Sequence, residues 1–323
     1  MNQLTIASNG LSLSEEQYQD LREFFYLKSK ELSENTLRGL KTDLRHFISF
    51  CEERQYTILP ASVSTIREFI RFRSEQGVKA STISRSLSAI SKLHGALNAA
   101  DPCRSELVRS ELTIARKASP ERKTQAIGIR YSHLSEWDKT VSVSTRLADK
   151  RDRAMMWFFY DGLLRGEEVS RAELSWIEFL DSGDGILTIP SSKTDQFGEG
   201  NEVYLSGHTC DALRDWLNAA GIESGRMFRS FTVKGALRDS MHSNGIRQVI
   251  SKRGFEMGVV GATNHSTRVG GTQDLLEAGE SVGRIQLAGR WKTPQMVLHY
   301  GRKQRITTGA MASLAKQQGR TKS

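Results

Sequence analysis

Residues 116–125 form a polar, basic segment that divides the chain into two parts. The segment reads RKASPERKTQ, and its charged residues and Pro120 are typical of a linker between domains. The chain has 323 residues, which is too many for one ordinary hydrophobic core, so two domains are expected. We place the first domain at residues 1–118, the linker at 119–126 and the second domain at 127–323.

The first domain is expected to be a bundle of amphipathic helices that follows a loose leader at residues 1–13. Ser14 to Gln17 matches a capping box, in which a serine and a glutamine three residues later close the start of a helix. Apolar residues then recur at the three-to-four-residue spacing of helices with one buried face. The expected helices cover residues 14–32, 35–54, 64–75, 79–98 and 104–117.

The second domain is expected to be larger and mainly α-helical, with a small β-sheet or hairpin. Residues 151–164 contain the apolar run Met155 to Phe159, which must be deeply buried in a helix. Residues 185–190 and 202–205 alternate like strands, and the polar, glycine-containing stretch between them is typical of a hairpin turn. Further helices are expected at residues 209–220 and 240–257.

The balance of charge indicates a polyanionic partner. Lysines and arginines number 46 against 37 aspartates and glutamates, which gives a net charge of +9 and a pI near 9.5. Residues 1–122 carry 18 basic and 15 acidic side chains, and residues 123–323 carry 28 and 22. The excess is spread over both domains rather than confined to a tail, which suits a two-domain clamp around a polyanion, although a basic pI alone is weak support.

Cysteine content and hydropathy argue against other classes of protein. The three cysteines, Cys51, Cys103 and Cys210, are scattered, so they predict neither a disulfide framework nor a zinc site. The N-terminus lacks the pattern of a signal peptide, and no apolar run approaches the roughly 18 residues of a membrane span. A cytoplasmic protein without membrane contact is therefore expected.

Side chains suited to phosphate chemistry gather in one stretch near the C-terminus. His265 and Arg268 are three residues apart, so on one helical turn they share a face and can converge on an anion. Trp291 adds an indole N–H donor. Thr293-Pro294 predicts the N-cap and first position of a short helix that holds Tyr300. The combination indicates phosphate chemistry with a tyrosine nucleophile.

Further charged residues are candidates for the same site. Arg165 follows the buried helix directly, and an arginine at the edge of a core must be paired or must bind an anion. Glu168, three residues on, could be its partner, and a purely structural Arg165–Glu168 pair is the alternative. Lys193 lies on the approach to the hairpin turn, where it could reach a neighbouring cleft or be a solvated charge.

The types and spacing of these residues resemble the motifs of the tyrosine recombinase (phage integrase) family. The family's arginine after a Leu-Leu pair is matched by Leu163-Leu164-Arg165, its hairpin lysine by Ser192-Lys193-Thr194, and its His-Ser-Ala-Arg-Val-Gly motif by residues 265–270. Trp291 stands nine residues before Tyr300, although many relatives carry histidine at the tryptophan position. The run Arg-Gly-Glu-Glu also differs from the usual neighbours but keeps a glutamate at the expected offset. The similarity extends from about residue 18 to about residue 316.

The resemblance implies a site-specific DNA recombinase that cuts and rejoins strands through a covalent 3′-phosphotyrosine and a four-way junction. No metal or nucleotide cofactor is expected. Arg165 and Arg268 would hold the scissile phosphate while Tyr300 attacks it. The implied catalytic residues are Arg165, Glu168, Lys193, His265, Arg268, Trp291 and Tyr300.

The remaining members of this set have supporting roles in the same interpretation. Lys193 would protonate the leaving 5′-oxygen as a general acid. Trp291 would donate its indole N–H to the phosphate, and His265 would bind a phosphate oxygen or manage the tyrosine proton. Glu168 would orient Arg165 or His265.

Polar helix faces supply the candidate DNA contacts. The helix at residues 79–98 has a serine-rich face, and small hydroxylated side chains permit close approach to a groove while Arg85 and Lys92 reach bases or phosphates. An ordinary exposed face is the alternative, and the linker could likewise follow a phosphate backbone or be solvated. The candidate contacts are Arg38, Lys41, Ser84, Arg85, Ser88, Lys92, Asn244 and Arg247.

The family also implies an assembly. The expected partners are double-stranded DNA with an inverted-repeat target and a homotetramer on two such sites, in a bacterial protein associated with the nucleoid or a plasmid. Residues 308–318 would pack into a neighbouring protomer, and a frayed, basic C-terminus is the alternative. Two other functions stay open: a DNA-relaxing topoisomerase with the same chemistry, and a DNA-binding protein with a relict site.

Overall fold

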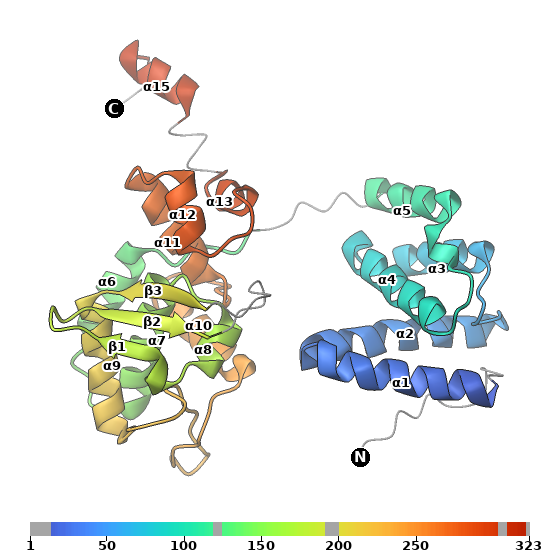
Figure 1. Cartoon of the computed structure of the whole chain (residues 1–323). Coiled ribbons are helices and arrows are strands. Elements are labelled where there is room, and N and C mark those ends of the chain that lie inside the picture. Colours follow the sequence, from blue (N-terminus) through green and yellow to red (C-terminus); the bar gives the residue numbers. More distant parts are fainter. Residues whose placement is uncertain (1–13, 119–124, 191–199, 303–308, 321–323) are drawn as a thin grey trace. The chain divides into compact units, whose positions relative to one another are not determined.

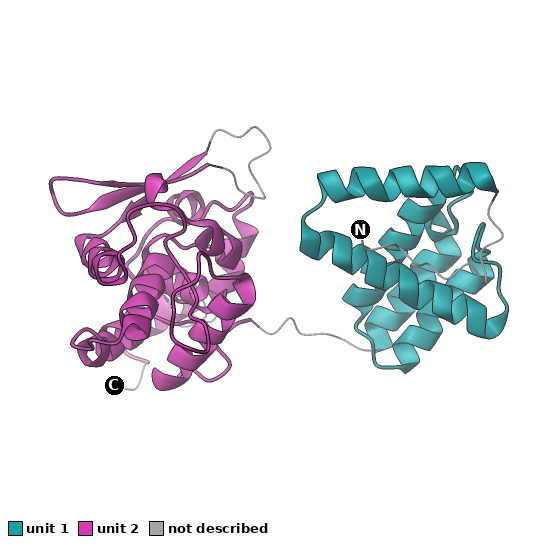
Figure 2. Ribbon diagram, turned by 90° about the horizontal axis from the view of Figure 1, so that it is seen from below, with its two compact units in different colours: residues 1–123 teal, residues 124–323 magenta. Residues whose placement is uncertain are grey.

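The computed structural model describes residues 14–118, 125–190, 200–302 and 309–320. The chain divides into two compact units, Met1–Lys123 and Thr124–Ser323, which Figure 2 shows in teal and magenta. Both units are mainly helical, and the second also holds a small antiparallel sheet (Figure 1). The predicted fold class, a mainly α chain of two domains with a small sheet in the second, is confirmed.

The first unit is all-helical among its described residues. Serine side chains cap three of its helices: Ser14, Ser33 and Ser62 each accept a hydrogen bond from the backbone N–H three residues later. The capping box at Ser14 is confirmed, because Gln17 Oε1 also accepts from Ser14 N at 3.0 Å. The elements are α1 (Glu15–Glu31), α2 (Glu34–Arg54), α3 (Val63–Glu75), α4 (Ala80–Ala96), the short 3₁₀ helix η1 (Pro102–Arg104) and α5 (Glu106–Ala118).

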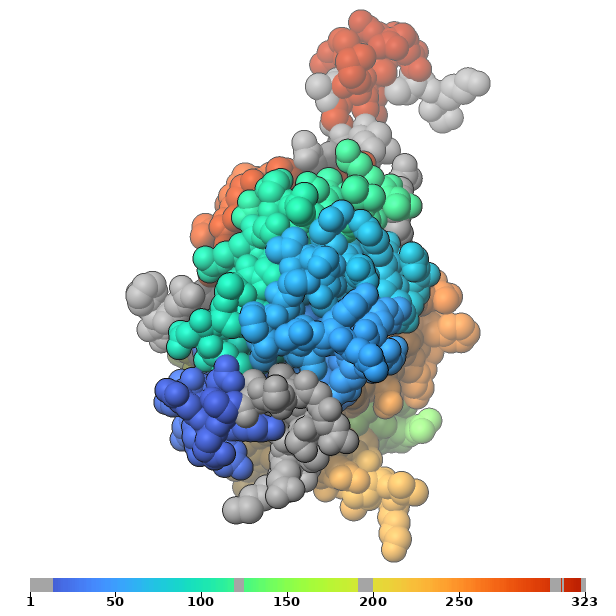
Figure 3. Space-filling model, turned by 90° about the vertical axis from the view of Figure 1, so that its right-hand side faces the viewer, coloured from blue at the N-terminus to red at the C-terminus, as the bar shows by residue number. Residues whose placement is uncertain are grey.

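The apolar stripes of these helices form the core of the first unit. Phe47 of α2 and Phe69 of α3 meet edge to face with their ring centroids 5.4 Å apart, and Ile90 of α4 is fully buried with them. His94 of α4 is also fully buried, and its Nε2 accepts a hydrogen bond from Ala61 N at 3.0 Å. In the space-filling view, the blue-to-green helices of this unit form a continuous surface (Figure 3).

The second unit places a three-stranded sheet among helices. The strand order is β1-β2-β3, both pairs are antiparallel, and Gly185 pairs with Leu205 at one end of the β2–β3 ladder. The predicted hairpin strands correspond to β2 and β3, whereas β1 was not expected from the sequence. The strands and the helices before α10 are α6 (Tyr131–Val141), α7 (Leu147–Asp161), α8 (Gly166–Arg171), η2 (Leu174–Trp176), β1 (Ile177–Phe179), β2 (Gly185–Ile189), β3 (Asn201–Leu205) and α9 (Gly207–Ala220).

The rest of the unit is a series of helices that carries the C-terminal motif. The predicted helix at residues 240–257 is observed slightly shorter, as α10. No prediction covered α6. The elements are α10 (Ser243–Glu256), α11 (Ser266–Glu277), α12 (Val282–Ala288), α13 (Gln295–Tyr300) and α15 (Ala310–Gln317).

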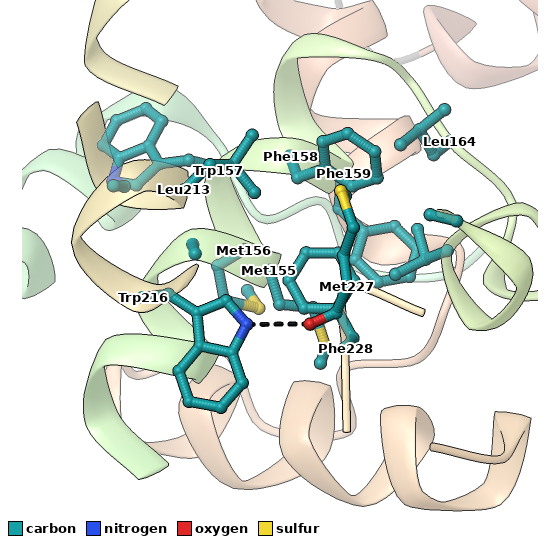
Figure 4. Packing of buried hydrophobic residues seen from close by; sticks show 14 of the residues in the cluster. Met155, Met156, Trp157, Phe158, Phe159, Leu164, Leu213, Trp216, Met227 and Phe228 are labelled. Carbon is teal, nitrogen blue, oxygen red and sulfur yellow. Dashed lines mark hydrogen bonds between the residues drawn. The ribbon is translucent and has the colours of Figure 1, made fainter. Parts of the chain in front are cut away.

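Helix α7 forms the centre of the core of the second unit. Met155, Met156, Phe158 and Phe159 are fully buried, as their apolar run predicts (Figure 4). The buried Trp216 of α9 satisfies its indole N–H by donating to the carbonyl of Met227 at 2.9 Å. This core fixes the C-terminal end of α7, and therefore the loop that leads to Arg165.

Gly270 lets α11 approach the segment before α6. Ile129 N donates to the carbonyl of Ser266 at 2.8 Å, and a Cβ at position 270 would lie only 1.8 Å from the carbonyl oxygen of Ile129. Backbone atoms cannot give way as a flexible side chain can, so only glycine fits here.

Replacing Gly270 should therefore destabilise the second unit. We expect Gly270→Ala to lower the free energy of unfolding by about 3 kcal/mol or more, because α11 and residue 129 must separate. Gly283→Ala is the matched control: nothing lies within 4 Å of its Cβ, so a gain of up to about 1 kcal/mol from helix propensity is expected. Urea unfolding followed by tryptophan fluorescence reports on this unit, because Trp137, Trp157, Trp176, Trp216 and Trp291 all belong to it. Equal midpoints for the two variants would contradict the packing argument.

Candidate active site

Arg165 lies where α7 gives way to α8. Leu163 and Leu164 are buried and anchor the chain after α7, so Arg165 emerges at the edge of the core as the N-cap of α8. Its Nη1 donates to Glu168 Oε1 at 2.7 Å and its backbone N–H donates to Glu168 Oε2 at 2.8 Å. The side chain is paired, as the structural interpretation expects, and is still partly exposed, which leaves it free to meet an anion as the other interpretation requires.

Glu168 is a buried carboxylate that two arginines share. It is 8% exposed, and besides Arg165 it accepts from Arg290 Nη2 at 2.9 Å. Burial alone would raise the pKa of this carboxyl, but Arg290 and then Arg165 outweigh burial and lower it. Glu168 is therefore ionised at neutral pH. Among the described residues its hydrogen bonds involve Arg165 and Arg290 and not His265.

Arg268 lies in the first turn of α11 and is almost completely buried, with 2% exposed. It donates from Nη1 to the carbonyl of Leu163 and from Nη2 to the carbonyl of Gly289. Its guanidinium carbon lies 4.3 Å from the centroid of the Trp291 ring. Burial, then the charges of Arg165 and Arg290, lowers the pKa of Arg268 to about 9, so the group still carries its charge at neutral pH.

The turn after α12 brings the two arginines together. Arg268 donates to the carbonyl of Gly289, and Arg165 Nη2 donates to the carbonyl of the next residue, Arg290, at 3.3 Å. A Cβ at Gly289 would lie 1.8 Å from the Trp291 ring, so glycine is needed for the indole to lie against this turn. Residues separated by about 100 positions thus meet around one short segment.

Tyr300 is the last residue of α13 and is 8% exposed. Its ring lies 5.8 Å from that of Trp291 at 62°, an edge-to-face contact. Its backbone carbonyl accepts from Gln125 Nε2 at 3.0 Å and from Gln273 Nε2 at 3.3 Å. Burial raises the pKa of the Tyr300 phenol, and the positive charges of Arg268 and Arg165 oppose this rise.

The start of α13 differs from the prediction by one residue. The helix begins at Gln295, its N-cap is Pro294 rather than Thr293, and no side chain caps it. Pro294 already has helical dihedral angles of −66° and −18°, as expected for a proline at the first helical position, so the prediction and the structure differ only in where the helix boundary is set. The expectation that Tyr300 is held by packing on a short helix agrees with the structure.

His265 is the N-cap of α11 and is exposed, whereas Arg268 one turn later is buried. Loss of hydration around the ring, then the charges of Arg268 and Arg165, lowers the pKa of His265. The imidazole is therefore neutral at neutral pH, and can accept a proton. The charges of both arginines thus act on the pKa of His265 as they do on that of Tyr300.

The predicted roles of Lys193 and of the candidate DNA contacts are not tested by the structure. Lys193 lies outside the described residues. In α4, Arg85 forms two hydrogen bonds to the buried carboxylate of Asp43, at 2.7 and 3.1 Å, and Ser88 Oγ donates to the carbonyl of Ser84 at 3.1 Å. These DNA contacts stay predictions, as do the exposed Arg38, Lys92, Asn244 and Arg247 and the half-buried Lys41.

Sequence reasoning missed Arg290. It directly precedes Trp291, and its position within this motif is the signal that could have drawn attention to it. Its Nη1 donates to the carbonyl of Gly162 at 3.0 Å, in addition to its ion pair with Glu168. Among the described residues, no group of three or more His, Cys, Asp or Glu side chains is arranged to hold a metal ion.

Comparison with models of known families identifies the family to which the chain belongs. The model of the phage integrase N-terminal SAM-like domain matches residues 21–101, and the model of the phage integrase family matches residues 134–305, more than half of the chain. The chain belongs to the phage integrase family. It is thus a tyrosine recombinase, an enzyme that cleaves and rejoins DNA strands. None of the helices in the described ranges is long and apolar enough to cross a membrane.

Relatives and solved structures agree with this membership. The chain is 25% identical over 343 residues to "Recombinase cre" of Escherichia phage P1, covering 97% of this chain and 98% of that protein, so the similarity extends over almost the whole length of both. It is 27% identical to an "Integrase/recombinase xerD homolog" of Selenomonas ruminantium, covering 84% and 82%.

The solved structures support the fold. The pre-cleavage complex of XerH site-specific recombinase bound to difH substrate matches with a TM-score of 0.62 at 13% identity, covering 95% of this chain and 91% of that one. The Tn1549 transposon integrase in complex with transposon right end DNA matches with a TM-score of 0.59 at 11% identity, covering 89% and 99%.

Proposed function

We propose that this tyrosine recombinase is site-specific and cuts DNA by attack of Tyr300 on a phosphodiester, which leaves a covalent 3′-phosphotyrosine. The observation that carries the proposal is the cluster around residues 289–291. Arg165 and Arg268 both bind this turn, and Trp291 contacts both Arg268 and Tyr300. A phenol beside two guanidinium groups suits phosphoryl transfer.

The proposed step exchanges one phosphodiester for another. The phenol oxygen of Tyr300 bonds to phosphorus as the bond to the 5′-oxygen breaks, and Arg165 and Arg268 stabilise the charge that develops on the nonbridging oxygens. Because no water is consumed, the bond energy is retained, and a 5′-hydroxyl on another strand can reverse the step.

Proton transfers complete the proposed mechanism. The raised pKa of Tyr300 means that the phenol is protonated at neutral pH and needs an acceptor. His265 has a lowered pKa and is neutral there, so it can take this proton or bind a phosphate oxygen. Lys193 would protonate the leaving 5′-oxygen. Glu168 orients Arg165, and Trp291 supplies an N–H donor to the phosphate.

The partners of this reaction are also proposals. The protein would act as a homotetramer on two inverted-repeat DNA sites, exchange strands through a four-way junction, and use no metal or nucleotide cofactor in a cytoplasmic, nucleoid- or plasmid-associated setting. The C-terminal helix α15 exposes Met311 and Leu314, which suits the predicted packing of residues 308–318 into a neighbouring protomer.

A suicide-substrate experiment tests the proposal. The protein first selects a DNA site from random sequence, and that site is then prepared with a nick next to the cleavage position. We expect a covalent protein–DNA adduct on a denaturing gel, with an unchanged yield in excess EDTA, because arginines rather than a metal ion meet the phosphate charge. Absence of the adduct, or its loss in EDTA, would contradict the mechanism. Relaxation of supercoiled plasmids that lack the selected site would favour the topoisomerase alternative.

A further inference from the structure

Arg290 has a backbone conformation that is unfavourable for its residue type. Its φ is +54°, in the left-handed region that residues other than glycine seldom adopt. Its side chain is only 5% exposed, and its Nε has no hydrogen-bond partner among the described residues. A residue keeps such a conformation only where the contacts around it over-determine its position, and such positions cluster at functional sites.

The side chain of Arg290 supplies these contacts. Nη2 donates to Glu168 Oε2 at 2.9 Å, Nη1 donates to the carbonyl of Gly162 at 3.0 Å, and Nη2 also lies 3.4 Å from the carbonyl oxygen of Leu163. The guanidinium therefore holds the turn that ends α7 and the carboxylate that orients Arg165. One planar group spans both features, which an ammonium group could not do.

The backbone of the same turn is bound in return. The carbonyl of Arg290 accepts from Arg165, and the carbonyl of Gly289 accepts from Arg268. Arg268 also donates to the Leu163 carbonyl that Arg290 contacts. Arg290 thus links the contacts that hold Arg165 to those that hold Arg268, although these two arginines lie on separate elements.

Charge gives Arg290 a second effect. The carboxylate of Glu168 fixes Arg165 in place. A carboxylate bound to Arg165 alone, however, would also neutralise the positive charge of this arginine. Because Glu168 shares its charge with Arg290, Arg165 keeps positive potential for a phosphate. The cluster contains one buried carboxylate, Glu168, and three arginines. Its net charge is therefore positive.

We propose that Arg290 is a positioning residue for strand cleavage. It binds Glu168 and the Gly162 and Leu163 carbonyls, and so aims Arg165 and Arg268 at one phosphate without touching the DNA itself. This inference rests on the proposed function of the same site, in which those two arginines grip the scissile phosphate.

The test measures the single-turnover rate constant of adduct formation at saturating protein on the selected, nicked DNA site. A rate constant, unlike a yield, does not depend on the fraction of folded protein. Arg290→Met should lower it about 100-fold through misplacement of the two arginines, while the Kd for the same DNA changes less than about threefold. Arg290→Lys keeps the positive charge but lacks the planar, forked donor group of arginine. Its rate constant should therefore be about tenfold higher than that of Arg290→Met.

Two further variants make the outcome decisive. Arg290→Gly fits the left-handed backbone and should fold well, yet should be as slow as Arg290→Met. In a Glu168→Gln background, Arg290→Met should cost about tenfold rather than 100-fold, because the ion pair with Glu168 is already lost while the contacts to the Gly162 and Leu163 carbonyls remain. Wild-type rates in Arg290→Gly, or fully additive effects in the double variant, would overturn the proposal. A wild-type protein that forms no adduct would instead overturn the proposed function.

Discussion

Tyr300→Phe should abolish covalent cleavage while leaving DNA binding intact. The phenyl ring can keep the edge-to-face contact with Trp291 at 5.8 Å, and the backbone carbonyl can still accept from Gln125 and Gln273. Only the nucleophilic oxygen is lost. We expect adduct formation to fall by a factor of about 10⁴ or more, to the limit of detection, since no other group can replace an attacking oxygen.

The measurement pairs the suicide-substrate assay with binding to the selected DNA site. Tyr26→Phe is a suitable control, because Tyr26 lies exposed on α1 in the first unit and should retain full activity. An adduct formed by Tyr300→Phe at a comparable rate would show that another residue is the nucleophile.

Arg268→Lys should have the second-largest effect. Arg268 has 2% exposure, donates to two backbone carbonyls and lies 4.3 Å from the Trp291 ring centroid. Lysine keeps the charge, but its single ammonium cannot bind both carbonyls, stack on the indole and face a phosphate at once. We expect the rate constant of adduct formation to fall about 100- to 1,000-fold, as for loss of one oxyanion donor.

Arg284→Lys gives the matched control for this change. Arg284 lies on α12, is largely exposed and forms an ion pair with Glu280 at 2.8 Å, so its replacement by lysine should leave the rate unchanged. If Arg268→Lys behaved like Arg284→Lys, the buried guanidinium would serve packing and not catalysis. Binding of DNA by both variants should be similar, which separates catalysis from assembly on the site.

Local sequence signals predicted much of the fold. Three signals depend only on neighbours within a few turns: the capping box at Ser14, the helical spacing of apolar residues in the first unit, and the buried run at residues 155–159. They were therefore visible without tertiary contacts. The strand β1 was missed because it has three residues and depends on pairing with β2.

The residue types of the candidate site were also evident from the sequence. His265, Arg268, Trp291 and Tyr300 share one stretch, and their spacing resembles that of the family to which the chain belongs. What a residue type can do chemically is independent of its position in space. Candidates for donating to a phosphate, or for attacking it, could therefore be named from the sequence alone.

Only the tertiary structure decided how these side chains are supported. Arg268 reaches the Leu163 carbonyl across 105 residues, and Arg290 reaches Glu168 across 122. A single sequence carries no signal for which carboxylate or carbonyl a distant arginine will meet, because folding of the whole domain brings them together. Arg85 illustrates the same point, since the structure pairs its exposed-face guanidinium with Asp43 of α2. The sequence by itself determined the helical architecture and the chemical groups, and long-range packing determined which of them share a site.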